Sequence, residues 1–310
     1  MSSPASAASA WEISRPGGRD VALMAVAVVG VSLSGPLTAM VVTAPVLAIA
    51  FWRNAVGAAL LLPVLLTRDR GVLRGLRWRD LGSSVVAGLF LAGHFAAWLP
   101  SLYMTSIGAS IALVTTTPIW TALAARASGV RFPPQVWSGL VLAVGGAALI
   151  AGVDVTVSLQ ALAGDGLALL GAIFAGGYVL AGARAREHLS TSTYTVAAYT
   201  TCAVSLAVAA LVVGSPLAGF EARDWWLILA ITLCAQILGH TLLNLVLSTV
   251  GPTVVSLAVL LEVPGALLVA LVLLADLPPL LALPGMAAVV VGVALVVRSS
   301  RPTTLVEPAT

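Results

Sequence analysis

The sequence predicts an all-α membrane protein in which ten transmembrane helices form two inverted five-helix repeats. Hydrophobic residues make up 60% of the 310 and charged residues only 9%, with a mean hydropathy of +1.07. A soluble domain has roughly a quarter of its residues charged, so lipid is the expected solvent of this chain. Charges and Pro/Gly breaks divide it into about ten apolar segments, each near the ~20 residues that cross a bilayer. Two stretches in opposite halves carry matching motifs, which predicts the repeat.

Each apolar segment is expected to be a helix, because a segment alone in hydrocarbon must satisfy its own backbone hydrogen bonds. The expected spans are residues 21–41, 46–66, 81–100, 104–125, 134–152, 165–183, 193–213, 225–246, 253–274 and 280–297. Pro100 and the polar residues up to Ser106 predict a reversal between the third and fourth spans. The two repeats are expected to cover residues 21–152 and 165–298.

The two ends of the chain are expected to be tails, a disordered one at residues 1–20 and a second at 299–310. The first twenty residues lack a basic start followed by an apolar core, so no cleaved signal peptide is predicted.

The arginines predict how the chain is oriented in the membrane. They gather before the first span and after the even-numbered spans, at Arg15, Arg19, Arg68, Arg70, Arg74, Arg77, Arg79, Arg126, Arg131, Arg184, Arg186, Arg298 and Arg301. The opposite loops are acidic, with Arg223 as their basic residue. The positive-inside rule therefore places both termini in the cytoplasm, in a bacterial inner membrane. Because the charge is topogenic, no nucleic-acid partner is expected.

The matching motifs predict the symmetry of the two halves. Gly93-His94 corresponds to Gly239-His240, and the run 105–108 (TSIG) corresponds to 248–251 (STVG). Five spans is an odd number, so the second half begins on the opposite side of the membrane from the first. Similar halves are then related by a two-fold axis in the membrane plane, as in many secondary transporters, whose sites lie at the midplane between halves.

Polar residues inside the spans are the candidates for a site at the membrane midplane between the two halves. In span eight, Thr232, Gln236, His240, Asn244 and Ser248 recur every four residues, which places them on one helix face. This face is expected to look into the bundle or a wet cavity, with helix–helix hydrogen bonding as the alternative. In span three, His94 and Trp98 form a similar pair, and an imidazole is able to titrate near neutral pH.

Two charged residues lie within spans. Arg53 in span two would cost about 2.5–3.5 kcal/mol at the bilayer centre, so it either lines a cavity or extends to the interface. Glu262 in span nine has small helical neighbours and is expected to pack against protein. It serves either proton coupling or solute contact, or it caps backbone beside Pro264. We regard both residues as coupling or structural charges.

Aromatic side chains complete the candidate set, either stacking on a solute or simply packing. The predicted cavity residues are His94, Trp98, Tyr103, Trp120, Tyr178, Gln236, His240 and Asn244. The sequence has no Walker motif, no GxSxG elbow and no Cys/His cluster with metal spacing, so no metal site, cofactor or enzymatic activity is expected. An intramembrane hydrolase is the minor enzymatic alternative. Cys202 and Cys234 are expected to be packed free thiols.

An ordered set of short motifs runs through most of the chain. It consists of Ile49-Ala50-Phe51-Trp52-Arg53, His94-Phe95, Trp98, Ser101-Leu102-Tyr103, Thr117-Pro118, Gly164-Asp165-Gly166, Tyr178, Gly182, Arg186, Gly239-His240-Thr241, Asn244 and Glu262. With ten spans in two halves, this set resembles the EamA family of the drug/metabolite transporter superfamily. The chain departs from the family pattern at Val263, which stands between the span-nine Glu and Pro264. The resemblance implies a carrier of small metabolites, often an exporter of amino acids or drugs, that works without ATP.

The sequence thus favours a secondary active transporter, with export by alternating access as the main hypothesis. An uptake permease, an antiporter and a non-transporting membrane scaffold are the alternatives. The expected partners are a small-molecule solute, the lipid bilayer and protons, and the protein is expected to be a monomer or a homodimer.

Overall fold

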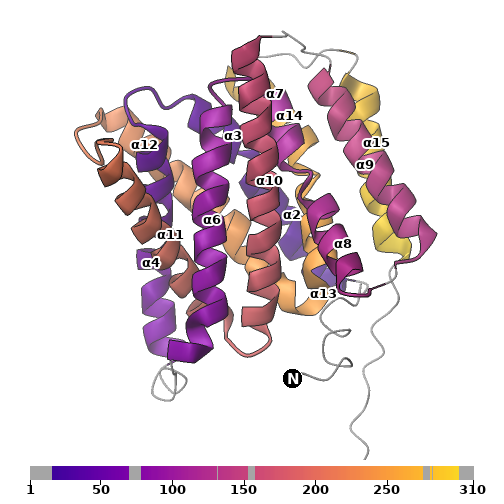
Figure 1. The fold of residues 1–310 in the computed structure, drawn as a ribbon, viewed down its shortest axis with the longest axis horizontal. Helices are drawn as coiled ribbons and strands as arrows, with labels where there is room; N and C mark the ends of the chain where they lie inside the picture. Colours follow the sequence, from indigo (N-terminus) through magenta and orange to yellow (C-terminus); the bar gives the residue numbers. More distant parts are fainter. Residues whose placement is uncertain are drawn as a thin grey trace, which may run out of the picture.

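The computed structural model describes residues 16–69, 78–130, 132–152, 158–274, 280 and 282–299, and Figure 1 shows them as a bundle of helices. The helices are α2 (Gly18–Ser32), α3 (Ser34–Ala39), α4 (Val46–Arg68), η1 (Trp78–Leu81), α6 (Gly82–Ser101), α7 (Ile107–Val114), α8 (Thr117–Ala127), α9 (Pro134–Gly152), α10 (Leu159–Arg186), α11 (Thr191–Val212), α12 (Ala222–Ile231), the π-helix η2 (Thr232–Thr241), α13 (Leu242–Val259), α14 (Glu262–Leu274) and α15 (Ala282–Ser299). The all-α prediction is confirmed for these residues. Most of the predicted tails, and most of the Arg-rich segment 70–79, lie outside them.

Seven helical segments are long and apolar enough to cross a membrane. They are Gly18–Ala39, Val46–Arg68, Gly82–Ser101, Ile107–Ala127, Leu159–Arg186, Thr191–Val212 and Ala222–Val259. Three shorter apolar helices, Pro134–Ile150, Glu262–Leu273 and Ala282–Arg298, accompany them. The expected gap between spans eight and nine falls at Gly251, a non-helical residue that divides α13 into two helical parts. The prediction of a multi-pass membrane protein is therefore supported, while the count of ten transmembrane helices remains a prediction.

Several of these segments are broken along their length, and the sequence explains where. In α13, Gly251 has φ 79° and ψ 165°, and it precedes Pro252. Glycine adopts positive φ without a steric cost, and proline cannot continue the backbone hydrogen bonding, so the helix bends at this pair. A second break separates α7 from α8 just before Pro118, which stands in the first turn of α8.

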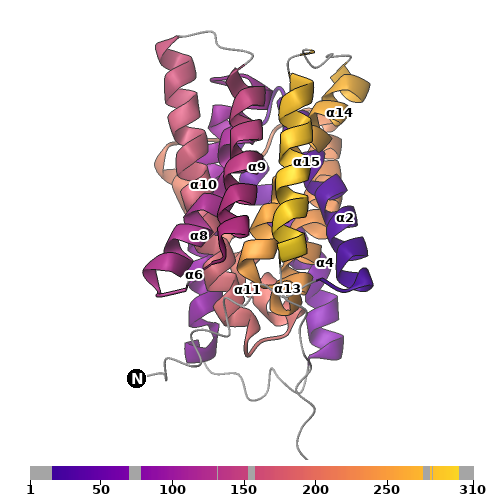
Figure 2. The same ribbon diagram turned by 90° about the vertical axis from the view of Figure 1, so that its right-hand side faces the viewer.

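The helices pair across the two halves of the chain. α6 packs along α10, α2 along η2 and α13, α4 along α11, and α9 along α15, and Figure 2 shows α9 and α15 side by side. Gly139 faces Gly292, and Gly146 faces Gly285, so α9 and α15 run antiparallel at close range. In the order of the repeats, α6 corresponds to η2 with α13, and α10 corresponds to α2, so the contact of α6 with α10 corresponds to that of η2 and α13 with α2. Likewise α4 corresponds to α11 and α9 to α15, so each of these two contacts corresponds to itself. This is the pairing that a two-fold relation between halves produces.

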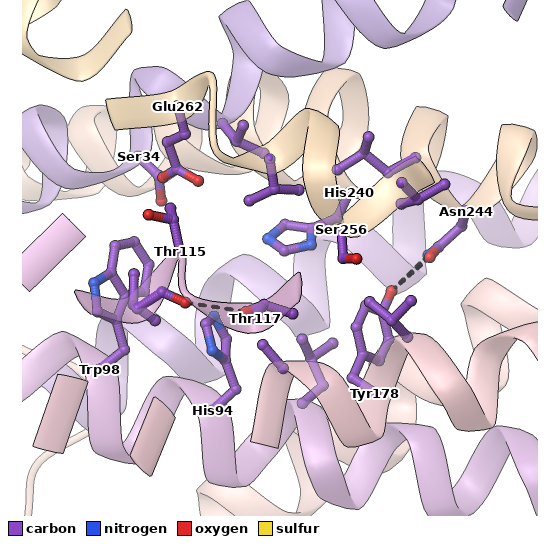
Figure 3. Close-up of a pocket in the computed structure, with 18 of the residues that line it drawn as sticks. Ser34, His94, Trp98, Thr115, Thr117, Tyr178, His240, Asn244, Ser256 and Glu262 are labelled. Atoms are coloured by element: carbon purple, nitrogen blue, oxygen red, sulfur yellow. Dashed lines mark hydrogen bonds between the residues drawn. The ribbon is translucent and has the colours of Figure 1, made fainter. Parts of the chain in front are cut away.

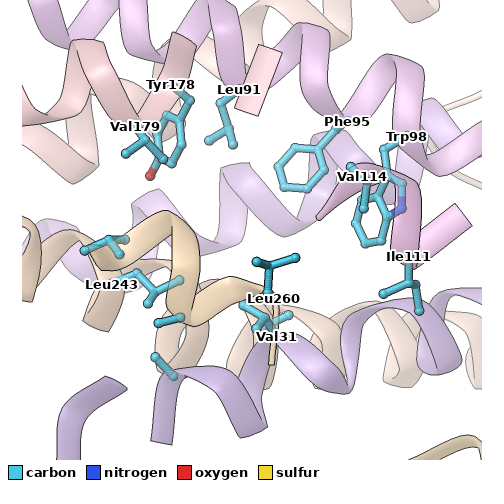
Figure 4. Packing of buried hydrophobic residues seen from close by; sticks show 14 of the residues in the cluster. Val31, Leu91, Phe95, Trp98, Ile111, Val114, Tyr178, Val179, Leu243 and Leu260 are labelled. Carbon is cyan, nitrogen blue, oxygen red and sulfur yellow. The ribbon is translucent and has the colours of Figure 1, made fainter. Parts of the chain in front are cut away.

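The centre of the bundle is apolar and is filled from both halves. Figure 4 shows Leu91, Phe95 and Trp98 of α6 with Tyr178 and Val179 of α10, all of them buried. Large apolar side chains on the outward faces are exposed, among them Val29 at 64%, Leu211 at 74% and Val272 at 80%. A helix that is apolar all round is buried in protein or in a membrane, and these outward faces are suited to lipid.

Candidate functional site

A cavity lies between the two halves of the chain, and polar groups from both halves line it (Figure 3). Its lining comprises Val31, Ser34, Leu91, His94, Trp98, Val114, Thr115, Thr117, Ala175, Tyr178, Val179, His240, Leu243, Asn244, Leu247, Val255, Ser256, Val259 and Glu262. The space that the centre of a water molecule can reach is about 60 Å³. Ligand pockets commonly measure roughly 300–1,000 Å³, so the cavity is narrow in this conformation.

His94 and Trp98 form one wall of the cavity. The Nδ1 atom of His94 lies 3.0 Å from the carbonyl oxygen of Gly171. A carbonyl only accepts, so Nδ1 carries the proton and Nε2 is left as an acceptor. The rings of His94 and Trp98 stack, with centroids 5.5 Å apart at 21°. Gly171 permits this approach of α10, because a Cβ there would lie 3.0 Å from the Trp98 Cβ.

Tyr178 and Asn244 join α10 to α13 at the opposite wall. The Tyr178 hydroxyl donates to Asn244 Oδ1 at 2.8 Å, and Asn244 Nδ2 lies 2.6 Å from the same hydroxyl. His240 stands between two aromatic rings in edge-to-face contact, Phe95 at 5.9 Å and Tyr178 at 6.3 Å. The two histidines therefore face the same cavity from α6 and η2.

Glu262 is the acidic member of the cavity lining. It is the first residue of α14, directly after the break at Leu260–Leu261, and it is only 6% exposed. Figure 3 shows its carboxyl beside Ser34 and Thr115. Within the described part of the chain, its oxygens accept no hydrogen bond and form no ion pair within 4.0 Å. A buried carboxyl without partners is costly, so this group is suited to a ligand or a proton.

Arg53 lies behind the cavity wall and is fully buried, so it neither lines the cavity nor extends to the interface. Its Nη1 donates to Ser34 Oγ and its Nε to Gln236 Oε1, both at 3.0 Å. Its guanidinium carbon lies 4.3 Å from the centre of the Phe95 ring. Gln236 Nε2 in turn donates to Asn54 Oδ1 at 2.9 Å. Arg53 thus contacts Ser34 of the cavity lining directly, and it touches Phe95, whose ring packs against His240.

Three predicted cavity residues lie elsewhere. Gln236 lies in the π-helix η2, and its side chain faces Arg53 and Asn54, with which it forms hydrogen bonds. Trp120 packs against α10 at Gly176, whose Cβ would lie 3.2 Å from the Trp120 Cβ. Tyr103 lies beyond the end of α6, is 45% exposed, and donates to the carbonyl of Thr38 at 2.9 Å.

The structure adds hydroxyl groups that sequence reasoning missed. Ser34, Thr115, Thr117 and Ser256 line the cavity. The signal for the two threonines was the run 115–117 (TTT) before Pro118 in an apolar span.

Cys202 and Cys234 are both free thiols.

Comparison with known proteins agrees with this fold. The model of the EamA-like transporter family matches residues 19–152 and again residues 162–298. A solved structure titled "Crystal structure of protein" superposes with a TM-score of 0.70 at 17% identity, covering 92% of this chain and 98% of that one. This likeness concerns the fold alone. No curated protein matches the chain. Since the family model covers most of the sequence in two copies, the chain belongs to the EamA-like transporter family, a family of drug/metabolite transporters.

Proposed function

We propose that this protein is a secondary active transporter that exports a small organic solute, of amino-acid or drug-like size, by alternating access. One observation carries the proposal: the central cavity is lined by both copies of the family match, with His94 from the first and His240 from the second. In an inverted repeat, equivalent inner positions surround the same midplane site. Relative movement of the halves would then expose one site to either face.

The chemistry of the lining supports a solute with an apolar body and a few polar groups. Leu91, Val114 and Leu247 offer apolar contact, and the Trp98 ring offers a stacking surface. Glu262 offers an acceptor that lacks a partner in the described structure, and a donor of the solute or a proton would supply that partner. The narrowness of the cavity means that a drug-sized solute requires the helices to part.

The test is solute flux into proteoliposomes, divided by the amount of folded protein in the membrane. We expect His94→Ala and His240→Ala each to lower this normalised flux several-fold, because each removes a polar group from the cavity wall. Val86→Ala is the control, since Val86 is 45% exposed on α6 and does not line the cavity. Glu262→Gln in the same assay should weaken the dependence of flux on the proton gradient.

Four results would count against the proposal. Wild-type normalised flux in both histidine variants would make these residues structural. Flux that survives collapse of the gradients but stops on ATP depletion would exclude secondary transport. Absence of flux for every solute tested would favour the membrane scaffold, and net uptake in whole cells would favour the permease.

A further inference from the structure

Two short loops lie at opposite ends of α4, and each is tied to helices of both halves. Residues 40–45 join α3 to α4, and residues 187–190 join α10 to α11. Thr43 precedes α4 and Asp69 follows it, and the 23 residues between make a helix of about 34 Å. The ties of the two loops therefore act at opposite faces of the bundle.

The first clasp, formed by Asp224 and Tyr103, holds loop 40–45. Asp224 is 1% exposed, and its Oδ2 accepts from Thr43 N and Thr43 Oγ1, both at 2.6 Å, and from Val42 N at 3.2 Å and Ala44 N at 3.3 Å. The hydroxyl of Tyr103, just after the end of α6, points at the carbonyl of Thr38 in α3 at 2.9 Å and at the carbonyl of Val41 in the loop at 3.4 Å. The loop is thereby bound to the start of α12 and to the end of α6.

The second clasp, formed by Arg186 and Asp69, holds loop 187–190. Arg186 donates to the carbonyl of Leu189, to the carbonyl of Asn244 at 3.3 Å and to Ser248 Oγ at 3.1 Å. The Asp69 carboxylate accepts from Ser190 and Ser192 at the start of α11.

Asp69 is charged at neutral pH. Burial raises the pKa of Asp69, but the hydrogen bonds from Ser190, Ser192 and Thr193 outweigh it, so its pKa lies below the ordinary value. The second clasp therefore joins loop 187–190 to α13 through a cation and to α4 through an anion.

Each clasp meets the bundle one helical turn beyond a residue of the cavity lining. Ser34 lines the cavity, and Thr38, an acceptor in the first clasp, lies four residues further along α3. Asn244 lines the cavity, and Ser248, an acceptor in the second clasp, lies four residues further along α13. Four residues are about one turn, so each clasp lies about 6 Å along a helix from a residue of the cavity lining.

We propose that these clasps are the two gates of the transport cycle: the cavity opens to one face when the Asp224–Tyr103 clasp releases, and to the other when the Arg186–Asp69 clasp releases. This inference rests on the proposed alternating access. Both clasps are made in the present structure, and the cavity between them is narrow. The clasps hold equivalent loops of the two halves, so opening one while keeping the other requires only relative movement of the halves.

The experiment measures access to the cavity with a cysteine at a lining position. Ala175→Cys is introduced into a chain in which Cys202 and Cys234 are replaced by Ala, and a membrane-impermeant maleimide is applied to vesicles of either orientation. Asp224→Asn and Tyr103→Phe should raise the labelling rate from the face that carries Thr43. Arg186→Gln and Asp69→Asn should raise it from the opposite face. A tenfold change in rate would correspond to a shift of about 1.4 kcal/mol between the conformations.

Matched controls remove the same charge beside each clasp. Arg184→Gln acts on the same helix end as Arg186 but on an exposed side chain, and Glu221→Gln acts next to α12 on an exposed acid. Both control variants should be labelled at the same rate as the parent protein, which carries only the Ala175→Cys, Cys202→Ala and Cys234→Ala changes. The amount of each variant in the membrane shows whether it folds.

The gate assignment fails if all four clasp variants label at the parent rate, or if both sets label faster from the same face. Labelling does not need a solute, so it separates this inference from the proposed function. If the labelling rates change as expected but no solute is transported, the gate assignment is supported and the proposed transport function is contradicted. If solute is transported but the labelling rates do not change, the transport function is supported and the gate assignment is contradicted.

Discussion

Arg53 illustrates how a single residue holds a charge inside this membrane protein. A charge at mid-bilayer costs about 2.5–3.5 kcal/mol on insertion scales, and here hydrogen bonds to Ser34 and Gln236 and the Phe95 ring offset that cost. Sequence reasoning identified Arg53 as a charge that is costly to place within a span. It could not name Gln236, which lies 183 positions away and seemed to belong to the cavity face.

Replacing Gln236 by Leu should destabilise the protein. The change removes the acceptor of Arg53 Nε and the donor to Asn54 Oδ1, so both buried groups lose their partner. Unpaired buried groups cost about 1–3 kcal/mol each, and charged ones more, so we expect a loss of about 2–5 kcal/mol. Thermal unfolding in detergent measures it, with Gln160→Leu, exposed at the start of α10, as control. Equal melting temperatures for the two variants would contradict the structural role of Gln236.

At the scale of elements, the π-helix η2 explains where the predicted periodicity breaks down. Residues four apart share a face in an α-helix, but the hydrogen bonds of a π-helix run to the fifth residue. Gln236 therefore turns towards α4, while His240 and Asn244 line the cavity. The carbonyl of Gln236 accepts from the Thr241 hydroxyl at 3.0 Å and from Tyr199 at 3.2 Å. Side chains thus support the wider turn, and such long-range partners leave no local pattern in the sequence.

The pairing of α9 with α15 makes a second prediction at this scale. A Cβ on Gly146 would lie 2.6 Å from the Gly285 carbonyl oxygen and 2.8 Å from the Ala288 Cβ, so Gly146→Ala forces the helices apart. Overpacking of this kind costs about 1–3 kcal/mol. The neighbouring Gly145 has nothing within 4 Å of such a Cβ, so Gly145→Ala is a matched control that should leave stability unchanged or raise it. Thermal unfolding of both variants decides, and a Gly146→Ala protein as stable as its control would disprove the close contact.

For the whole molecule, composition and charge were enough to predict an all-α membrane protein, because the bilayer dictates helix length and polarity, and the matching motifs predicted two similar halves. His94, Trp98, Tyr178, His240, Asn244 and Glu262 were all proposed from sequence and all line the cavity. Trp120, Tyr103 and Gln236 do not line it, since the direction of one side chain depends on how helices rotate against each other. The interruption at Gly251 falls between the expected spans 225–246 and 253–274, whereas the break at Leu260–Leu261 was not foreseen, because apolar sequence continues through it.

The orientation in the membrane is the remaining prediction for the whole molecule. The described arginines Arg68, Arg126, Arg186 and Arg298 each stand in the last turn of a helix, and Figure 1 shows α4, α8, α10 and α15 ending towards one face. Because loops rich in arginine stay in the cytoplasm, that face should be cytoplasmic. A reporter that is active only in the cytoplasm should therefore function when fused after Thr310.

The opposite face supplies the matched fusion. Leu159 begins α10, and the 28 residues of that helix reach about 42 Å, so it stands on the other side of the bundle from Arg186. A reporter that is active only in the periplasm should function after Leu159 and fail after Thr310. Moving the junction along α10 from Leu159 to Glu187 should convert a periplasmic signal into a cytoplasmic one, because one helix separates the two positions. Signals of the same kind at both junctions would mean that α10 does not cross the membrane, and exchanged signals would invert the orientation and, with it, the cytoplasmic assignment of the Arg186–Asp69 face.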